Sequence, residues 1–373
     1  MDALDEVGSM TAGMLADRSV ALVHEWFGSV GGSEKVFVSL GGLIPHAKRF
    51  VLWQDRDVVD DFALHQSWMS RTPLRRSKAV ALPFMPLAWR TLTRSQFDVV
   101  ISSSHAFAHT VKLRYSPDTR YLSYVHTPAR YVWSPGLDGR GANPFLAWPR
   151  RALQAADIRL SQHTHSYAAN SREVQARIRK FWNRDARVIN PPVDVEFYGD
   201  APASDRLQNR DYLLGVGRWI PYKNFDLMIR IAEAANMPLV IAGGGQQEPA
   251  LRRMAADTTV PVTFELRPSN ERLRQLYWGA WSLLFPAHED FGIIPVEAQA
   301  CGTPVIGLSR GGLSETVIDG ESGFLVDSLR ANDYARLVPE VGRLDREVIQ
   351  RQASQFSHAA FEANLAKWVA SEC

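Results

Sequence analysis

An apolar strand passes directly into a helix at Phe285-Pro-Ala-His-Glu-Asp-Phe-Gly-Ile-Ile-Pro-Val-Glu297. Glu289 follows the strand, at the sheet edge where side chains of an open α/β domain face a crevice. Gly292 predicts the turn, Pro295 stands where a helix start tolerates proline, and Glu297 follows in the first helical turn. The free N–H groups of such a start suit a phosphate, and two flanking carboxylates suit the hydroxyl groups of a sugar and a ribose. The helix dipole alone would explain Glu297, but not Glu289.

Two cations follow another strand of the same half of the chain. The stretch Gly215-Val-Gly217-Arg218 is followed by Lys223. Two cations at the carboxyl end of a strand suit a diphosphate, and the glycines keep the backbone thin there. Cations after strands are also common on surfaces, so this pair is informative only together with the carboxylates. The dinucleotide fingerprint G-x-G-x-x-G is absent, because Ile220 stands at the place of its third glycine.

Strands alternate with helical segments in both halves. In the second half we predict strands at Tyr212–Val216, Leu239–Ala242, Val262–Phe264, Ser282–Phe285, Pro304–Gly307 and Gly323–Val326. The glycine run 243–245 predicts either a tight turn that a ligand approaches closely or an ordinary loop. Strand–helix alternation indicates parallel sheets covered on both faces. The fold class is therefore α/β, with two doubly wound domains, and Asn190-Pro-Pro192 with residues 199–209 is the predicted linker.

Composition agrees with two globular domains. The chain has 373 residues, 46% of them hydrophobic and 22% charged, which excludes a disordered chain. Residues 1–190 carry 25 Lys and Arg against 16 Asp and Glu, whereas residues 191–373 carry 17 against 24. The basic half suits an anionic partner, although such a charge split also helps two domains to pack. Two cysteines predict a reducing cytoplasm, and residues 1–18 read as a disordered overhang without a signal peptide.

The first half offers a separate group of candidates. Gly31 and Gly32 follow the first strand and precede a helix that we expect Ser33 to cap, so their amides would face a phosphate. His126 follows a strand inside an aromatic, proline-containing turn that also holds Arg130. A lone histidine is more often structural, but this position makes His126 a catalytic candidate. The histidines show no recurring ligand spacing, so we predict no zinc site.

Residues 62–97 contain no Asp or Glu and are interrupted by Arg75, Arg76 and Lys78 among other cations. Apolar residues lie between the cations: Trp68, Leu74, Phe84, Met85, Leu87 and Trp89. This pattern predicts a peripheral contact with an anionic membrane surface or its lipid-linked substrate. A solvated basic loop over an ordinary core helix explains the pattern almost as well.

These stretches resemble the family-4 retaining glycosyltransferases of the GT-B fold. Glu289 to Glu297 resembles the E-x7-E motif of the family, Gly217-Arg218 with Lys223 its diphosphate-binding Arg/Lys pair, and Gly31-Gly32 its N-terminal glycine loop. The segment His126–Trp133 is similar to bacterial members, many of which use GDP-mannose in polysaccharide assembly. The similarity covers nearly the whole chain from Ser19.

The resemblance implies a nucleotide-sugar donor held by Gly31, Gly32, Gly217, Arg218, Lys223, Glu289, Phe291, Gly292, Ile293, Ile294 and Glu297. It places Glu297 at the ribose, Glu289 at the transferred sugar, and Arg218 with Lys223 at the leaving diphosphate. The predicted catalytic residues are Glu289, Arg218, Lys223 and His126. Enzymes of this type generally need no metal, so we predict no metal and no cofactor besides the donor.

The implied fold is GT-B, with two Rossmann-like domains facing a central cleft. We expect an acceptor domain at 19–200, a donor domain at 201–354, and a C-terminal helix at 355–373 that crosses back to the first domain. The implied reaction moves a hexose, mannose from GDP-mannose, to a glycan or polyprenyl-diphosphate-linked acceptor. Arg75, Arg76, Lys78 and Arg130 would meet that acceptor or the inner face of the membrane. We expect no nucleic-acid partner, because the basic half lacks a recognisable module.

Three alternatives stay open. A UDP-sugar-dependent transferase would share the fold and the motifs. A sugar phosphorylase or a nucleotide-sugar epimerase would share the fold with different chemistry. A catalytically silent subunit would bind the nucleotide sugar alone, although the intact Arg218, Lys223, Glu289 and Glu297 argue against loss of activity.

Overall fold

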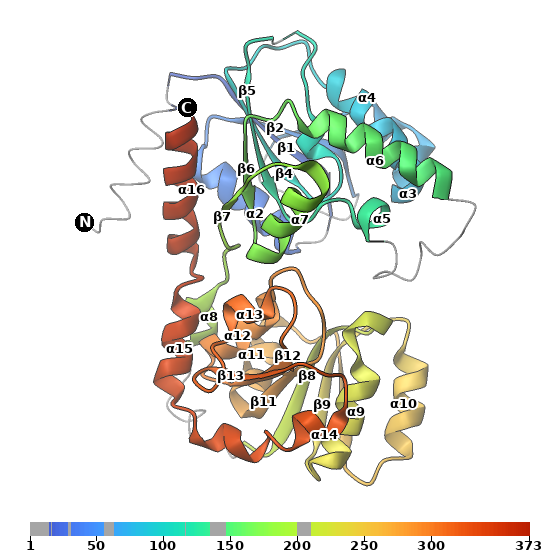
Figure 1. Ribbon diagram of the computed structural model, residues 1–373, viewed down its shortest axis with the longest axis vertical. Helices are drawn as coiled ribbons and strands as arrows, with labels where there is room; N and C mark the ends of the chain where they lie inside the picture. The colour runs from blue at the N-terminus through green and yellow to red at the C-terminus, as the bar shows by residue number, and fades with distance from the viewer. Residues whose placement is uncertain are drawn as a thin grey trace. The chain divides into compact units, whose positions relative to one another are not determined.

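The computed structural model describes residues 15, 17–28, 31–55, 63–115, 117–134, 147–199 and 210–373. These residues form two compact units (Figure 1). Unit 1 comprises residues 1–192 and 359–373, and unit 2 comprises residues 193–358. Each unit has one parallel sheet with helices packed on it, which confirms the predicted α/β class.

Unit 1 is built on a parallel sheet with the strand order β3-β2-β1-β4-β5-β6-β7 among the described residues. Its strands are β1 (Val20–Phe27), β2 (Lys48–Gln54), β3 (Leu64–Gln66), β4 (Val99–Ser104), β5 (Arg120–Val125), β6 (Ser166–Ala169) and β7 (Arg187–Val188). All eight residues of β1 are buried, as expected of a central strand covered on both faces. The order reverses between β1 and β4, and ligands of such sheets bind beyond the carboxyl ends of the strands at that point.

Unit 2 repeats this topology with the strand order β10-β9-β8-β11-β12-β13. The strands are β8 (Tyr212–Arg218), β9 (Leu239–Gly244), β10 (Val262–Leu266), β11 (Ala280–Phe285), β12 (Val305–Leu308) and β13 (Gly323–Val326). All six lie where the sequence predicts them. The helices between them include α9 (Phe225–Ala234), α10 (Glu248–Ala256), α11 (Asn270–Gly279) and α12 (Ile293–Ala300). The order reverses between β8 and β11, so the ends of these two strands define the expected ligand position.

The chain changes unit at two points that differ from the expected boundaries. Unit 2 begins at Val193 rather than after residue 200, because helix α8 (Val195–Gly199) packs on unit 2. There the indole of Trp278 donates to the carbonyl of Tyr198 at 3.1 Å. Helix α15 (Arg346–Ser354) also belongs to unit 2, and unit 1 resumes at Ala359 rather than at residue 355.

Helix α16 (His358–Glu372) contributes the last part of unit 1. Phe361, Leu365 and Trp368 recur on one helical face and are buried in a core cluster that includes residues of β1, β4 and β5. The indole of Trp368 donates to Ser166 Oγ at 2.9 Å. The C-terminal helix is thus an integral part of the unit 1 core.

Several details of the expected fold need correction. Gly31, and not Ser33, caps helix α2 (Gly32–Leu43). The predicted N-terminal overhang lies mostly outside the described residues, but Leu15 is fully buried and Arg18 donates to the Cys373 carbonyl at 2.7 Å. The predicted linker at 199–209 lies outside the described residues after Gly199. Among the described residues, no helix combines the length and the apolar character needed to cross a bilayer.

Trp368→Ala tests the role of α16 in unit 1. Trp368 is 1% exposed, and removing a buried tryptophan of this kind costs about 3–5 kcal/mol. We expect a loss of that size in the free energy of unfolding, measured by urea denaturation. The exposed neighbour Lys367→Ala is the control on the same helix and should unfold like the wild type. Equal stability of both variants would show that α16 does not contribute to the unit 1 core.

Candidate functional site

A pocket of about 530 Å³ opens in unit 2 at the carboxyl ends of β8, β9 and β10. Its lining includes Gly217, Arg218, Lys223, Ile294 and the glycine run 243–245. These segments meet because parallel strands end at one edge of the sheet, next to the reversal of strand order. The structure therefore brings four of the predicted donor residues, Gly217, Arg218, Lys223 and Ile294, to one pocket.

The glycines of this pocket allow the ends of β8 and β9 to approach each other closely. Gly217 and Gly243 have φ values of +140° and +137°, and a Cβ on Gly243 would lie 1.9 Å from the carbonyl oxygen of Gly217. A Cβ on Gly245 would lie 2.5 Å from the carbonyl oxygen of Trp219. Gly243 and Gly244 are the last residues of β9 and only Gly245 follows the strand, so the run is mostly strand rather than the predicted tight turn or loop. The backbone that approaches it closely is that of β8 and the residue after it.

The two predicted cations differ in their surroundings. Lys223 is buried, with 7% exposure, and its ammonium group forms an ion pair with Glu289. The same ammonium lies 5.2 Å from the ring centroid of Phe285. Arg218 is exposed, and its side chain has no ion-pair or hydrogen-bond partner among the described residues. Lys223 is thus held in place, whereas the guanidinium of Arg218 is free to meet an anion.

Sequence analysis missed a third cation of this pocket, Arg267. It follows β10, adopts a left-handed φ of +46°, and its backbone N–H donates to the Gly243 carbonyl at 2.8 Å. Arg267 is exposed and lines the pocket with Arg218. The signal was present in the sequence, because Arg267 follows a strand just as Arg218 does.

The loop that carries Glu289 is fixed by backbone contacts. Gly292 caps α12 with a left-handed φ of +105°, so Ile293 and Ile294 begin the helix. Gly312 donates to the Glu289 carbonyl at 2.8 Å, and a Cβ on Gly312 would lie 2.2 Å from Phe291 Cα. The side chain of Phe291 is buried in the core and leaves only its backbone for a ligand. The supporting glycine was not predicted, since it lies after β12.

Glu297 lies apart from the pocket lining. It is 7% exposed and accepts a hydrogen bond from the Tyr277 hydroxyl at 3.0 Å. Burial, and next the Glu297 carboxylate, raise the pKa of Tyr277 well above its usual value of 10. Tyr277 therefore stays protonated and keeps its proton directed to Glu297. The structure thus places Glu289 against Lys223, whereas Glu297 lies against Tyr277.

In unit 1, the predicted His126 lies at the reversal of strand order, after β5. Its Nε2 is 2.8 Å from Ser103 Oγ, at the end of β4. Burial, and next the neighbouring His105 and His24, hold the pKa of His126 well below its usual value of 6.5. His126 is therefore neutral near pH 7 and can accept or donate one hydrogen bond. Arg130 begins the short helix α5 (Arg130–Trp133), which follows His126 in the chain.

The amide of Gly31 already has a carboxylate partner. It donates to Glu34 Oε2 at 3.2 Å, and Ser33 Oγ donates to the same oxygen at 2.8 Å. An anionic ligand at this helix start therefore has to compete with Glu34, which the sequence prediction for Gly31 and Gly32 did not consider.

Sequence analysis also overlooked a buried carboxylate beside His126. Glu25 on β1 is fully buried and accepts hydrogen bonds from the backbone N–H groups of Ala106 and Ala108, each at 2.8 Å. Burial would raise the pKa of Glu25, but the charge of His105 and these hydrogen bonds outweigh it and lower the pKa well below 4.5. Burial, and next His105, lower the pKa of His24 to about 4. Glu25 is thus ionised and His24 neutral at pH 7.

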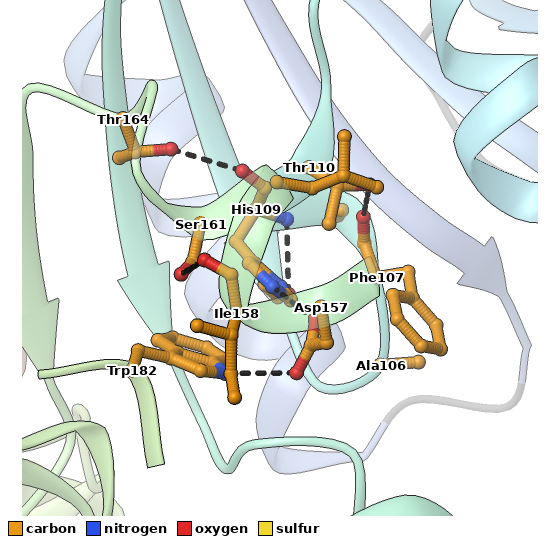
Figure 2. A network of polar contacts seen from close by, with 12 residues as sticks. Ala106, Phe107, His109, Thr110, Asp157, Ile158, Ser161, Thr164 and Trp182 are labelled. Carbon is orange, nitrogen blue, oxygen red and sulfur yellow. Dashed lines mark hydrogen bonds and ion pairs between the residues drawn. The ribbon is translucent and has the colours of Figure 1, made fainter. Parts of the chain in front are cut away.

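A polar network that includes His109, Asp157 and Trp182 supports the segment after β4 (Figure 2). Ser104 Oγ donates to Glu25 Oε1 at 3.1 Å and lies 3.2 Å from His109 Nδ1. His109 Nε2 lies 2.8 Å from Asp157 Oδ1, and Asp157 Oδ2 accepts from the indole of Trp182 at 2.8 Å. Because His109 and Asp157 are fully buried, this network holds residues 105–110 in one conformation.

The basic segment of unit 1 is only partly as expected. Arg76 and Lys78 are exposed and Arg75 is half-buried, and the Lys78 ammonium lies 4.2 Å from the Trp26 ring centroid. The exposed apolar side chains are Trp68, Val80, Phe84 and Leu87. Met85 and Trp89 are fully buried, so they belong to the core and not to the expected apolar surface.

Comparisons with known proteins cover both units. Residues 31–197 match the family model described as Glycosyltransferase Family 4, and residues 200–355 match the one described as Glycosyl transferases group 1. D-inositol 3-phosphate glycosyltransferase of Mycobacteroides abscessus is 36% identical over 190 residues, which are 47% of this chain and 41% of that protein. The enzyme of the same name from Nocardiopsis dassonvillei is 32% identical over 237 residues, 57% of this chain and 54% of that protein. The chain thus spans about half the length of the curated relatives it matches.

Solved structures share the fold over nearly the whole chain. The Anabaena protein HepE in complex with UDP superposes with a TM-score of 0.71 at 17% identity, covering 95% of this chain and 100% of that one. The lipopolysaccharide outer core galactosyltransferase WaaB gives a TM-score of 0.68 at 16% identity, with the same coverage. The likeness to these structures, together with the two parallel-sheet Rossmann-like units, confirms the α/β GT-B fold class predicted from the sequence.

Gly243→Ala tests whether the pocket depends on the close contact between the ends of β8 and β9. The added Cβ would clash with the Gly217 carbonyl and force a left-handed backbone, so we expect a loss of at least about 1–2 kcal/mol in stability. Gly244→Ala is the matched control, because its Cβ would meet Arg267 only at an ordinary 3.6 Å. Urea denaturation of both variants measures the difference. Equal stability of the two variants would show that the ends of β8 and β9 do not contact each other closely at Gly217 and Gly243.

Proposed function

We propose that this chain moves a hexose from a nucleotide sugar to an acceptor with retention of configuration, because residues 31–197 and 200–355 match two glycosyltransferase family models. The observation that carries the proposal is the unit 2 pocket, where Arg218 lies unpaired near the Lys223–Glu289 ion pair. A sugar nucleotide carries a diphosphate next to sugar hydroxyls. Cations suit the diphosphate and a carboxylate suits the sugar hydroxyls, so these side chains match that ligand.

The pocket residues have distinct proposed roles. Arg218 binds the diphosphate directly, because no other group of the described residues competes for it. Lys223 is already neutralised by Glu289, so the arriving phosphate takes over part of that ion pair. Glu289 then accepts a hydrogen bond from a hydroxyl group of the sugar. Both cations stabilise the negative charge that develops on the leaving diphosphate.

Residues around α12 complete the proposed donor site. The N–H groups of Phe291 to Ile294 face sugar and phosphate at the helix start. Glu297 binds the ribose hydroxyls, which requires the nucleoside to reach the buried carboxylate beside Tyr277. Gly217 lets the diphosphate approach the end of β8.

The donor is proposed as GDP-mannose, with a UDP-sugar as the alternative. The His126–Trp133 segment supports GDP-mannose, because it is similar to bacterial enzymes that use this donor. The alternative is supported by HepE, which was solved with UDP and with UDP-glucose. The name of the curated relatives, D-inositol 3-phosphate glycosyltransferase, carries no information on the base of the donor.

We assign acceptor recognition to unit 1. Neutral His126 at the end of β5 can hydrogen-bond an acceptor or donor hydroxyl, and Arg130 can bind a phosphate of a polyprenyl-diphosphate-linked glycan. No metal is assigned to the donor site, because Arg218 and Lys223 supply the positive charge there. A catalytically silent subunit remains the rival: it would bind the nucleotide sugar and transfer nothing.

Arg218→Ala is the sharpest variant for the donor site. Titration calorimetry with GDP-mannose and UDP-glucose first identifies the donor of the wild type. For that donor we expect Arg218→Ala to weaken binding about 10- to 100-fold, since a charge-assisted hydrogen bond contributes roughly 1.5–3 kcal/mol. Arg253→Ala changes another exposed arginine of unit 2, outside the pocket lining, and should bind like the wild type. Unchanged affinity of Arg218→Ala would remove the diphosphate from this pocket.

The same titration separates the enzyme from its silent rival. If the wild type binds a donor tightly, transfer to lipid-linked acceptors or slow hydrolysis of that donor should follow. Tight binding without either reaction would favour the silent subunit.

We also propose a peripheral position at the inner face of the membrane. The exposed Trp68, Val80, Phe84 and Leu87 share one chain segment with the exposed cations at 71, 76, 78 and 90. Each well-placed cation contributes about 1 kcal/mol of attraction to an anionic surface, and the apolar side chains add shallow insertion.

Charge reversal tests the membrane proposal. We expect the wild-type protein to co-sediment with anionic vesicles at low salt, but not with neutral vesicles. The triple change of Arg75, Arg76 and Lys78 to Glu should abolish this binding. Reversal of Arg179, Lys180 and Arg187, three exposed cations elsewhere in unit 1, changes the net charge equally and should leave binding intact. Equal behaviour of the two triple variants, or no wild-type binding, would contradict this position.

A further inference from the structure

Three side chains in unit 1 gather potential metal-ligating atoms at the reversal of strand order. His24 and Glu25 lie on β1, and His105 follows directly after β4. One ligand atom from each lies within 4.8 Å of the other two. His24 and Glu25 are fully buried, and the side chain of His105 is 19% exposed. None of the three has a role in the donor pocket.

The orientation of His24 leaves one nitrogen available. Its Nδ1 lies 3.0 Å from the carbonyl oxygen of Ser103, which can only accept a hydrogen bond. Nδ1 also lies 3.2 Å from Ser103 Oγ, but its contact with the carbonyl oxygen requires a proton on Nδ1, so Nε2 keeps its lone pair. Nε2 is buried and has no hydrogen-bond partner among the described residues. A histidine whose Nδ1–H is held by a backbone carbonyl while its Nε2 stays free has the arrangement of a metal ligand.

Glu25 presents one less occupied oxygen. Its Oε1 accepts hydrogen bonds from Ala106 N, Ala108 N and Ser104 Oγ, so that oxygen is saturated. Oε2 is contacted by His105 alone, through its backbone N–H at 3.2 Å and its Nδ1 at 3.1 Å. The contact with Nδ1 lacks hydrogen-bond geometry, so this nitrogen is also without a hydrogen-bond partner in the described part of the chain. Two imidazole nitrogens without a hydrogen-bond partner in the described part of the chain thus lie beside a carboxylate oxygen that accepts only one backbone N–H.

A buried outer layer holds these groups in place. The segment that carries His105 is fixed through Ser104, His109 and Asp157, the network of Figure 2. Metal sites depend on such outer hydrogen bonds, which orient the ligands before the ion arrives. Only His105, at the partly exposed side, has room to adjust.

We propose that His24 Nε2, Glu25 Oε2 and His105 Nδ1 bind a divalent first-row transition ion, with Zn²⁺ as the best match. Two imidazoles and one carboxylate are ligands that Zn²⁺ takes, whereas Mg²⁺ and Ca²⁺ prefer oxygen alone. Bonds of about 2.0–2.1 Å in a tetrahedral site bring ligand atoms to roughly 3.3 Å of each other, so the three groups close in on the ion. Three protein ligands leave a fourth position for water or a substrate oxygen, reached past His105.

The prediction of no zinc site rested on the lack of a recurring ligand spacing in the sequence, whereas the three groups proposed here come from positions far apart in the chain and meet only in the fold. The inference does not rest on the proposed function, because it concerns unit 1 side chains and a measurement that needs no sugar nucleotide. Its failure would leave the donor site in unit 2 untouched.

The test is metal stoichiometry of the full chain. Protein stripped with a chelator is loaded with Zn²⁺, freed of excess by gel filtration, and analysed by mass spectrometry of the metal. We expect one Zn²⁺ per chain, a higher melting temperature, and visible d–d absorption when Co²⁺ replaces Zn²⁺. His105→Ala, at a partly exposed position, and His24→Ala should each lose the bound ion and the absorption.

His46→Ala is the control, because His46 is an exposed histidine of the same unit. It should retain the ion. A chain that keeps no Zn²⁺, or keeps it equally in His105→Ala and His46→Ala, would overturn the proposed site. If His24→Ala fails to fold, the His105→Ala result decides alone.

Discussion

The ion pair between Lys223 and Glu289 is the constraint on which the donor site depends. It joins the segment after β8 to the segment after β11, the two strands between which the order of the unit 2 sheet reverses. Both side chains are largely buried, so neither charge is stable without the other. The pair consequently fixes two loops relative to each other and leaves the positive charge of the pocket to Arg218 and Arg267. Under the proposed function, a diphosphate that binds Lys223 would release Glu289 for a sugar hydroxyl, which would link the binding of the two parts of the donor.

Close backbone contacts make this arrangement possible. Gly243 touches the end of β8, and Gly312 touches the backbone of Phe291 beside the Glu289 loop. At both places a side chain of any size would push the loops apart. The pocket is therefore shaped by the absence of side chains at a few positions, while the charged groups are supplied by loops that these contacts hold. In unit 1 the comparable position between β1 and β4 is instead filled by buried polar side chains around Glu25.

Most strands of unit 2 and several residues of the candidate site could be predicted from the sequence, for physical reasons. Buried parallel strands are continuous apolar runs, so strands such as β11 and β12 of unit 2 stand out, and cations or carboxylates directly after strands mark the sheet edge. The edge strand β3, with its exposed residues, gave no such signal. Contacts between distant segments were also invisible: Arg267 joins the pocket from β10, and Glu25 accepts amides from beyond β4. Met85 and Trp89 were misassigned because alternation with cations does not show which side of a short helix is buried.

The central claim is that the diphosphate of a sugar nucleotide binds in the unit 2 pocket, at the Lys223–Glu289 ion pair. A crystal structure of the protein with its preferred nucleoside diphosphate tests it most directly. We predict phosphate oxygens within hydrogen-bonding distance of Arg218 and Lys223, at the start of α12, with Glu289 turned away from Lys223. A nucleotide bound elsewhere, or one bound here with its phosphates pointing away from both cations, would contradict the account.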